Sequence, residues 1–102
     1  MNIEETVARQ RQFFMEGKTL SLSYRRDALA RLRQSILTHE ADINAALRAD
    51  LNKSPTESYM CEIGMTLSEL SYVQKHMSRW AKDRRVATPL AQFHAKSFTV
   101  KQ

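Results

Sequence analysis

The sequence predicts a mainly α-helical chain with a short N-terminal helix, a long antiparallel helical hairpin and an extended, β-strand C-terminal tail. Apolar residues recur at helical spacing through most of the chain, and strict alternation is confined to its last residues. Glycine and proline number only 2 each in 102 residues, which leaves little material for the tight turns of a small all-β fold. A length of 102 residues fits one domain at most.

The first predicted helix covers about residues 3–16. Its apolar face consists of Ile3, Val7 and Phe14, which recur at helical spacing. Asn2 is suited to the N-cap position, and Glu5 three residues later resembles the second half of a capping box. Gly17 follows where a helix C-terminus favours a residue that tolerates positive φ.

The second predicted helix covers about residues 23–50 and begins near Ser21 or Ser23. Its apolar stripe comprises Leu29, Leu32, Ile36, Ile43 and Ala46, with His39 at one position of the stripe. Such a helix would be about 40 Å long at the standard rise per residue. The pattern breaks at Asn52-Lys53.

The third predicted helix covers about residues 55–83 and has the clearest start in the chain. Ser54 stands at the N-cap, Pro55 at the first helical position and Glu57 where a capping box needs an acid. One face carries Met60, Ile63, Leu67, Leu70, Met77 and Ala81. Because the connection before it is short, this helix should fold back on the second as an antiparallel hairpin.

The C-terminal tail changes pattern after Thr88-Pro89. Residues 96–102 alternate, with Phe98 and Val100 on one side. We find no second segment with the pattern of a strand, and a single strand leaves its backbone donors and acceptors unpaired. Either the tail is frayed or the sequence ends within a larger structure, and we favour the second interpretation.

The side chains that could carry chemistry do not form a recognisable site. Cys61 is the single thiol, and its place next to the Met60–Ile63 stripe predicts a partly buried structural cysteine. The histidines are His39, His76 and His94, whose spacing does not suit a zinc site. The acids of residues 55–72 are Glu57, Glu62 and Glu69, which we assign to a cap and to solvated faces. Two isolated glycines cannot form a phosphate loop. We therefore assign no catalytic, cofactor-binding or metal-binding residue to this chain.

Composition excludes further classes. No apolar run approaches the roughly 20 residues of a membrane helix, and the acidic N-terminus has no signal-peptide core. One cysteine favours a reducing compartment, so we expect a cytoplasmic location without a membrane partner. The formal net charge is +5, with the basic excess concentrated after residue 72. No nucleic-acid motif accompanies that excess, so we expect no nucleic-acid partner.

The order of residues resembles the N-terminal portion of an aldehyde dehydrogenase, closest to the class 3-like branch. The most specific block is Ala46-Leu47-Arg48-Ala49-Asp50-Leu51-Asn52-Lys53-Ser54. Further matches in register are Arg9, Phe13, Gly17-Lys18-Thr19, Tyr24-Arg25, Leu29, Leu32, Glu57, Glu62-Ile63, Leu67-Ser68-Glu69, Trp80, Arg85-Val86, Thr88-Pro89-Leu90 and Ala95-Lys96-Ser97. One departure is His94, which stands where the family often has proline.

The resemblance implies that residues 1–102 form a helical scaffold that precedes a β-ribbon, a Rossmann-like cofactor domain and a catalytic domain. The parent would oxidise aldehydes to carboxylic acids with NAD or NADP. The family's catalytic cysteine and cofactor residues would lie downstream, so Cys61 is not the family's nucleophile. The chain alone should be inactive and bind no cofactor, and its partner would be the remainder of the enzyme chain.

Two other functions remain open on the residues themselves. The long apolar stripes also suit a stand-alone interaction module that forms a homo-oligomeric helical bundle. Helices that cover another domain expose such stripes in its absence, so for the scaffold too we expect the isolated chain to dimerise or form higher oligomers, for example along the 97–100 edge. The basic tail alone suggests a weak nucleic-acid binder, whose affinity would fall steeply with salt.

Overall fold

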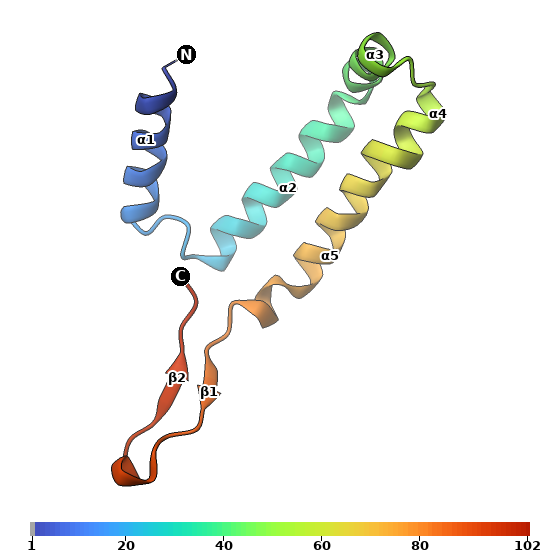
Figure 1. Cartoon of the computed structure of the whole chain (residues 1–102). Helices are drawn as coiled ribbons and strands as arrows, with labels where there is room; N and C mark the ends of the chain where they lie inside the picture. The colour runs from blue at the N-terminus through green and yellow to red at the C-terminus, as the bar shows by residue number, and fades with distance from the viewer. Residues whose placement is uncertain (1) are drawn as a thin grey trace.

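The computed structural model describes residues 2–102 as an open, elongated molecule (Figure 1). The helices are α1 (Ile3–Met15), α2 (Leu22–Thr38), α3 (Glu40–Leu51), α4 (Pro55–Ser58) and α5 (Gly64–Trp80), and the strands are β1 (Arg84–Val86) and β2 (Ser97–Thr99). The radius of gyration is 20.1 Å, whereas a compact domain of this length has about 13 Å. The predicted class, mainly α with a strand tail, is confirmed.

Local signals set both ends of α1. The side-chain oxygen of Asn2 accepts hydrogen bonds from the backbone amides of Glu4 at 3.1 Å and Glu5 at 3.4 Å. Beyond the C-terminus, Gly17 has φ of 72°, a conformation that costs a residue with a Cβ atom free energy. The structure thus places this helix at Ile3–Met15, against the 3–16 that the sequence suggests.

The predicted single helix over 23–50 is wrong: the structure has two helices that meet at His39, which has ψ of 18°. The ring Nδ1 of His39 lies 2.8 Å from the carbonyl oxygen of Ser35, which also accepts the His39 amide at 3.0 Å. His76 makes the same contact with the carbonyl oxygen of Tyr72 inside α5, which continues past it, so this bond accompanies the break at His39 and does not by itself cause it. Glu40 and Asp42 in the first turn of α3 then suit a new helix N-terminus.

The third predicted helix begins where its cap indicates but contains a π-helical turn, Tyr59–Ile63, between α4 and α5. Ser54 Oγ accepts from the Glu57 amide at 3.2 Å. A π turn holds one residue more than an α turn, so the buried positions step by five, from Ser58 to Ile63. Met60, predicted on the core face, is therefore 68% exposed.

The core lies between α2 and α5, which run antiparallel side by side as the predicted hairpin (Figure 1). Ile63, Leu67 and Leu70 are buried and pack against Leu29, Ile36 and Ile43. Met77 is buried further along α5. Arg33 of α2 adds polar contacts, since its Nη2 donates to the carbonyl of Leu67 at 3.1 Å and to Ser71 Oγ at 2.5 Å. The core is small for the length of chain that it supports.

Gly64 is required by the π-helical turn, and we expect Gly64→Ala to destabilise the chain. A Cβ atom there would lie 2.7 Å from the carbonyl oxygen of Tyr59. Glycine to alanine normally stabilises a helix interior by about 1 kcal/mol, but here the backbone must shift, so we expect a loss of about 1 kcal/mol. Urea unfolding followed by circular dichroism measures the change. Ser68→Ala, on the exposed side of α5, is the control, and a gain from Gly64→Ala would contradict the prediction.

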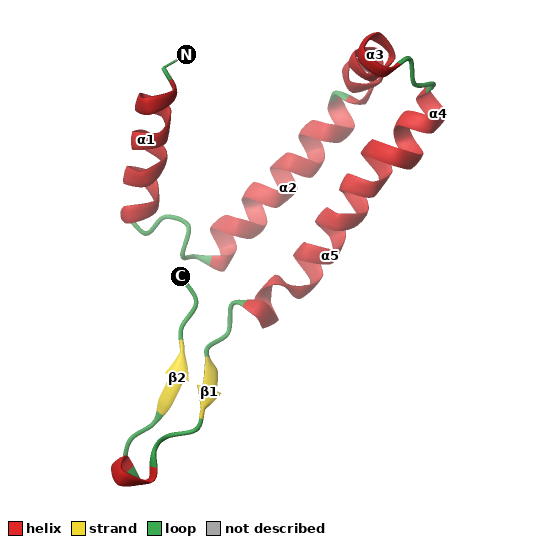
Figure 2. Cartoon of the chain, viewed as in Figure 1, coloured by secondary structure: helices red, strands yellow, loops and turns green. Residues whose placement is uncertain are grey.

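The sequence predicted that the strand in the tail would have no partner, and this prediction is wrong. β1 pairs antiparallel with β2, with Arg84 opposite Thr99, Arg85 opposite Phe98 and Val86 opposite Ser97 (Figure 2). Thr88 Oγ1 donates to Ser97 Oγ at 3.0 Å and joins the two arms near the loop. The β1 strand has three residues and one apolar side chain, too few to show alternation. The ribbon projects away from the hairpin (Figure 2).

Candidate functional site

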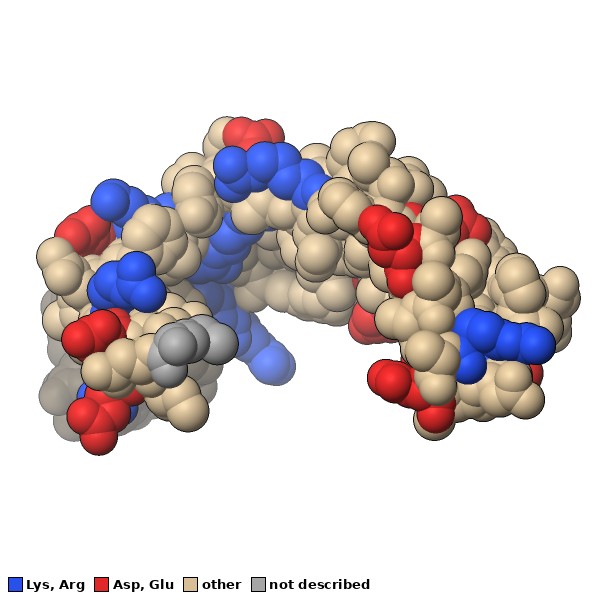
Figure 3. All heavy atoms as spheres, turned by 90° about the horizontal axis from the view of Figure 1, so that it is seen from above, with Lys and Arg blue, Asp and Glu red and all other residues tan. Residues whose placement is uncertain are grey.

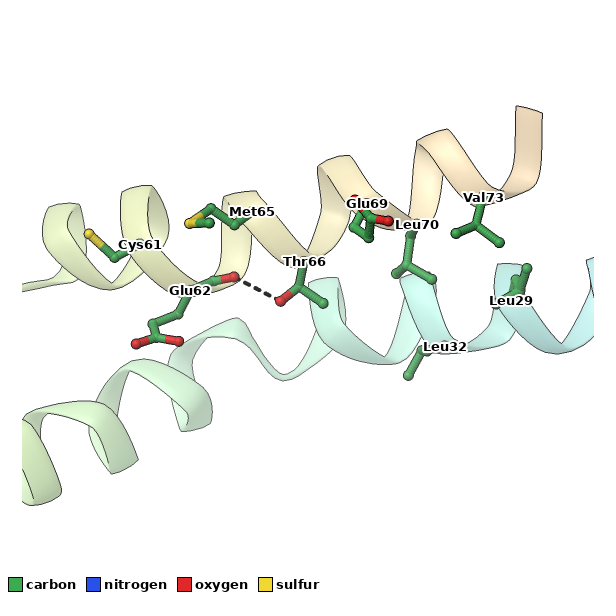
Figure 4. Close-up of a pocket in the computed structure, with 9 residues that line it drawn as sticks. All are labelled: Leu29, Leu32, Cys61, Glu62, Met65, Thr66, Glu69, Leu70 and Val73. Atoms are coloured by element: carbon green, nitrogen blue, oxygen red, sulfur yellow. Dashed lines mark hydrogen bonds between the residues drawn. The ribbon is translucent and has the colours of Figure 1, made fainter. Parts of the chain in front are cut away.

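An open apolar groove of about 530 Å³ runs between α2 and α5 (Figure 4). Its walls include Leu29, Leu32, Met65, Glu69, Leu70 and Val73. Leu32 and Met65 are exposed, and Leu70 forms part of the core beneath. Helical periodicity places these side chains, since residues three or four apart on each helix share a face. We call this surface the α2–α5 groove.

Charged and thiol groups stand at the end of the α2–α5 groove near the π-helical turn. Lys53 Nζ lies 2.5 Å from Glu62 Oε1, and this hydrogen bond raises the pKa of Lys53. Cys61 is exposed, not partly buried as predicted, because the extra residue of the π turn rotates it away from the core. Glu69 lies further along the groove, beside Leu70, and has no ion-pair partner within residues 2–102. The carboxylate near the π-helical turn is therefore paired, whereas that of Glu69 is not.

A second apolar surface lies on α1. Ile3 and Phe14 are 74% and 48% exposed, and Val7 is also exposed. At the C-terminal end of the helix, the ring of Phe13 lies 5.9 Å from that of Tyr24, with Lys18 Nζ 5.2 Å above its centre. These contacts hold the end of α1 while its predicted apolar stripe faces solvent. Burial of that stripe requires another surface.

A basic surface surrounds the end of α5 and the ribbon. A depression of about 670 Å³ is lined by Arg79, Trp80, Lys82, Asp83, Arg84, Arg85 and Lys101. The aromatic rings of Tyr72, His76 and Trp80 stack along α5 beside it, with centroids 4.2 and 5.7 Å apart. In Figure 3, positive and negative side chains lie together on the left side of the molecule, which contains α1. Carboxylates predominate over basic side chains on its right side.

The histidines considered for a metal site each make local contacts. His39 bonds the carbonyl of Ser35, His76 bonds that of Tyr72, and the ring of His94 lies 4.0 Å from that of Phe93. Across residues 2–102, no cluster of three or more His, Cys, Asp or Glu side chains is placed to hold a metal ion. Glu57 lies in the first turn of α4, and Glu62 bonds Lys53.

The arrangement suits association more than chemistry. Two apolar surfaces, on α1 and in the α2–α5 groove, are open and about a helix in length. The sequence predicted their stripes but not their exposure, and Met15, Met60 and Met65 are also exposed. Amino-acid composition gives the number of apolar residues but not the share of them that is buried, and in this chain that share is low. Over the described residues, no helix is both long enough and apolar enough to cross a bilayer.

Comparison with known proteins places this fold. The chain is 36% identical over 100 residues to a 4,4'-diaponeurosporen-aldehyde dehydrogenase of Staphylococcus aureus, across 98% of this chain and 22% of that protein. It is 41% identical over 91 residues to a dimeric NADP-preferring aldehyde dehydrogenase of Canis lupus familiaris, across 88% of this chain and 20% of that protein. No protein-family model matches it.

A solved structure gives the same answer. The substrate-bound state of Staphylococcus aureus AldH superposes on the whole chain with a TM-score of 0.90 at 37% identity, and the match covers 22% of that structure. The chain thus spans about a fifth of the length of the relatives that it matches, and the match falls in their N-terminal part. The predicted resemblance is confirmed by both sequence and fold. The relatives that the chain matches include family 3 enzymes. This chain belongs to the aldehyde dehydrogenase superfamily.

Proposed function

We propose that the chain forms the helical N-terminal scaffold of an NAD(P)-dependent aldehyde dehydrogenase that oxidises aldehydes to carboxylic acids. The observation that carries this proposal is an incomplete fold: residues that align with a fifth of an enzyme leave both apolar surfaces open. Burial of apolar surface is the main favourable term in folding. The remainder of an enzyme chain is the partner that such surfaces fit.

The chemistry in this proposal belongs to that remainder. A thiolate there would attack the aldehyde carbonyl, hydride would pass to the nicotinamide, and water would release the acid from the thioester. The relative from Canis lupus familiaris is an NADP-preferring enzyme, which supports a nicotinamide cofactor. We assign no residue of this chain to the cofactor or the catalytic steps, and propose a cytoplasmic location.

A chimeric enzyme tests the scaffold role. The matched region of Staphylococcus aureus AldH is replaced by residues 1–102, and nicotinamide reduction is followed by absorbance with an aldehyde substrate. We expect the chimera to turn over, the enzyme without its matched region to be inactive, and residues 1–102 alone to give no reduction.

The controls separate folding from function. Circular dichroism and size-exclusion chromatography establish that each protein is folded. A folded chimera without turnover would contradict the scaffold role, and turnover by residues 1–102 alone would contradict the assignment of the chemistry to the rest of the enzyme.

A stand-alone interaction module is the second candidate, and the exposure of α1 and of the α2–α5 groove favours it. In that case the open surfaces would be covered by other copies of the chain.

A further inference from the structure

We propose that the depression between the end of α5 and the ribbon is a docking site for a carboxylate-bearing surface of the remainder of the enzyme chain. This inference rests on the proposed function and adds the chemistry that the remainder presents at one place. The depression has a volume of about 670 Å³, and we call it the basic depression. It shares no lining residue with the α2–α5 groove or with the apolar face of α1.

The basic depression carries positive charge that its own chain does not neutralise. It is lined by five cations and one acid, which are Arg79, Lys82, Arg84, Arg85, Lys101 and Asp83. Within residues 2–102, the two ion pairs join Lys18 to Glu16 and Lys53 to Glu62. In that part of the chain, neither Asp83 nor any of the five cations is therefore paired, and the counter-charge comes from solvent ions or from a partner.

The polarity of α5 explains only part of this charge. Arg79 and Lys82 lie at the C-terminal end of the helix, where its dipole favours cations. Arg84 and Lys101 lie past the helix on the two arms of the ribbon. Thr99 lies opposite Arg84, and Lys101 follows Thr99 by two residues, so Arg84 and Lys101 share one face. Long side chains at such diagonal positions reach each other, and a carboxylate between them offsets their repulsion.

The position of the ribbon indicates that it is held from outside this chain. β1 and β2 pair only with each other, and no extensive contact joins them to a helix within residues 2–102 (Figure 2). Two strands alone are marginally stable in water. Even so, the whole chain, ribbon included, superposes on the longer Staphylococcus aureus AldH with a TM-score of 0.90. A surface that fills the basic depression would contact α5 and the ribbon at once and hold them in this arrangement.

Continuity of the chain favours the remainder over a separate anionic partner. Lys101 lines the basic depression, and the match to the relatives falls in their N-terminal part. In the proposed enzyme, the remainder therefore starts at this surface. A tethered segment acts at an effective concentration of about 1 mM, which a nucleic acid or a second copy of the enzyme has to exceed in order to displace it.

Carboxylates are the groups that fit this surface. Arginine binds a carboxylate through two parallel hydrogen bonds, and the side chains of Arg84 and Arg85 are exposed and available for such bonds. A cation that is covered without a counter-charge costs free energy. Trp80 is 44% exposed and stacks on His76 with centroids 5.7 Å apart, so it adds an apolar rim. We therefore expect Asp or Glu side chains of the remainder beside Arg84 and an apolar group over Trp80.

Carbodiimide cross-linking of the chimera with Staphylococcus aureus AldH tests the partner, because the reagent joins a lysine amine to a carboxylate in direct contact. We expect Lys82 or Lys101 to be joined to an Asp or Glu of the AldH part, in peptides from the monomer band of a denaturing gel. Lys75, an exposed lysine of α5 outside the basic depression, is the control and should give no such product.

Three results of the cross-linking would overturn the proposal. The first is the absence of any product that joins Lys82 or Lys101 to a residue of the AldH part. The second is an equal yield from Lys75. The third is a product confined to the dimer band, which would make a second copy the partner.

Charge reversal in the same chimera tests the contribution of the carboxylates. Arg84→Glu should raise the rate of unfolding at a fixed high temperature about fivefold, since it sets like charges against each other. Lys96→Glu makes the same change in charge on the ribbon outside the basic depression and should change the rate less than about twofold. Circular dichroism follows the loss of helix.

A rescue variant completes this test. Replacing the cross-linked carboxylate by arginine in the Arg84→Glu chimera should restore the slower unfolding, since the pair is present again with its charges exchanged. Equal rates for Arg84→Glu and Lys96→Glu, or no recovery in the rescue variant, would overturn the proposal.

Turnover separates this inference from the proposed function. At room temperature the Arg84→Glu chimera should oxidise the aldehyde as fast as the unaltered chimera, because the basic depression takes no part in the chemistry. A folded chimera without turnover contradicts the scaffold role, whereas normal turnover with no change in the unfolding rate of Arg84→Glu contradicts only the docking site.

A nucleic-acid probe tests whether the basic depression is covered in the full chain. A fluorescein-labelled single-stranded DNA oligonucleotide is added to the chimera at low salt, where phosphate contacts are strongest, and its anisotropy is measured. We expect no binding. Binding that Arg84→Glu abolishes would show that the basic depression is open and would overturn the proposal.

Discussion

Replacing Ile63 by alanine is expected to reduce the free energy of unfolding by about 3 kcal/mol, the largest loss we predict for a single truncation. Ile63 is 3% exposed and packs with Leu67 and Leu70 against residues of α2 and α3. Truncation leaves a cavity that the surrounding side chains fill only in part. Because the core of this chain is small, no second layer of apolar side chains offsets the loss.

Urea unfolding followed by circular dichroism at fixed protein concentration measures this effect. Met60→Ala is the matched control, since Met60 belongs to the same π-helical turn and is 68% exposed. We expect the control to change stability by less than about 0.5 kcal/mol. Equal losses from the two variants would show that the π-helical turn does not exist in solution, because a regular helix places Met60 on the core face.

This contrast also shows what the sequence could predict. The start of the third helix follows from local chemistry, since Ser54, Pro55 and Glu57 act within one turn. The faces of that helix follow from periodicity only while the period is constant. The π-helical turn changes the period at one place, so the same rule identified Leu67 and Leu70 correctly and misplaced Met60.

The break at His39 and the pairing of β1 were missed for a related reason. His39 contacts the carbonyl oxygen four residues before it, but His76 makes the same contact within the continuous helix α5, so the residue type at position 39 does not predict a break. The β1 strand forms because β2 returns beside it, and a three-residue strand has little pattern of its own. Both features depend on the arrangement of neighbouring segments, which single-residue preferences do not describe.

The candidate surfaces were predictable as stripes but not as sites. Ile3, Val7 and Phe14 are readily identified as one face of a helix, and the sequence alone suggests that such a face is buried. Whether a partner covers it depends on the number of elements that pack together, and here α1 stands apart from the hairpin (Figure 1). The family resemblance supplied the reason, since the relatives are about five times longer.

Arg33→Ala is expected to reduce the free energy of unfolding by about 2 kcal/mol, because Arg33 links the two helices of the hairpin. The two hydrogens of its Nη2 are shared among three acceptors, the carbonyl oxygen of Leu67 at 3.1 Å, Ser71 Oγ at 2.5 Å and Gln74 Oε1 at 3.4 Å. Hydrogen bonds to a charged group contribute more than neutral ones, and partial exposure of the guanidinium reduces that contribution. The stem of the side chain also covers apolar surface.

Two variants separate these contributions in the same urea unfolding experiment. Arg31→Ala removes an exposed arginine from α2 and should change stability by less than about 0.5 kcal/mol. Arg33→Lys keeps the charge and most of the stem but loses the planar fork, so its stability should lie between those of the wild type and Arg33→Ala. If Arg33→Lys had the same free energy of unfolding as the wild type, the charge alone would hold α2 against α5. If Arg33→Ala had the same free energy of unfolding as Arg31→Ala, the hydrogen bonds to α5 would contribute nothing. Apolar contacts alone would then set the register of the hairpin.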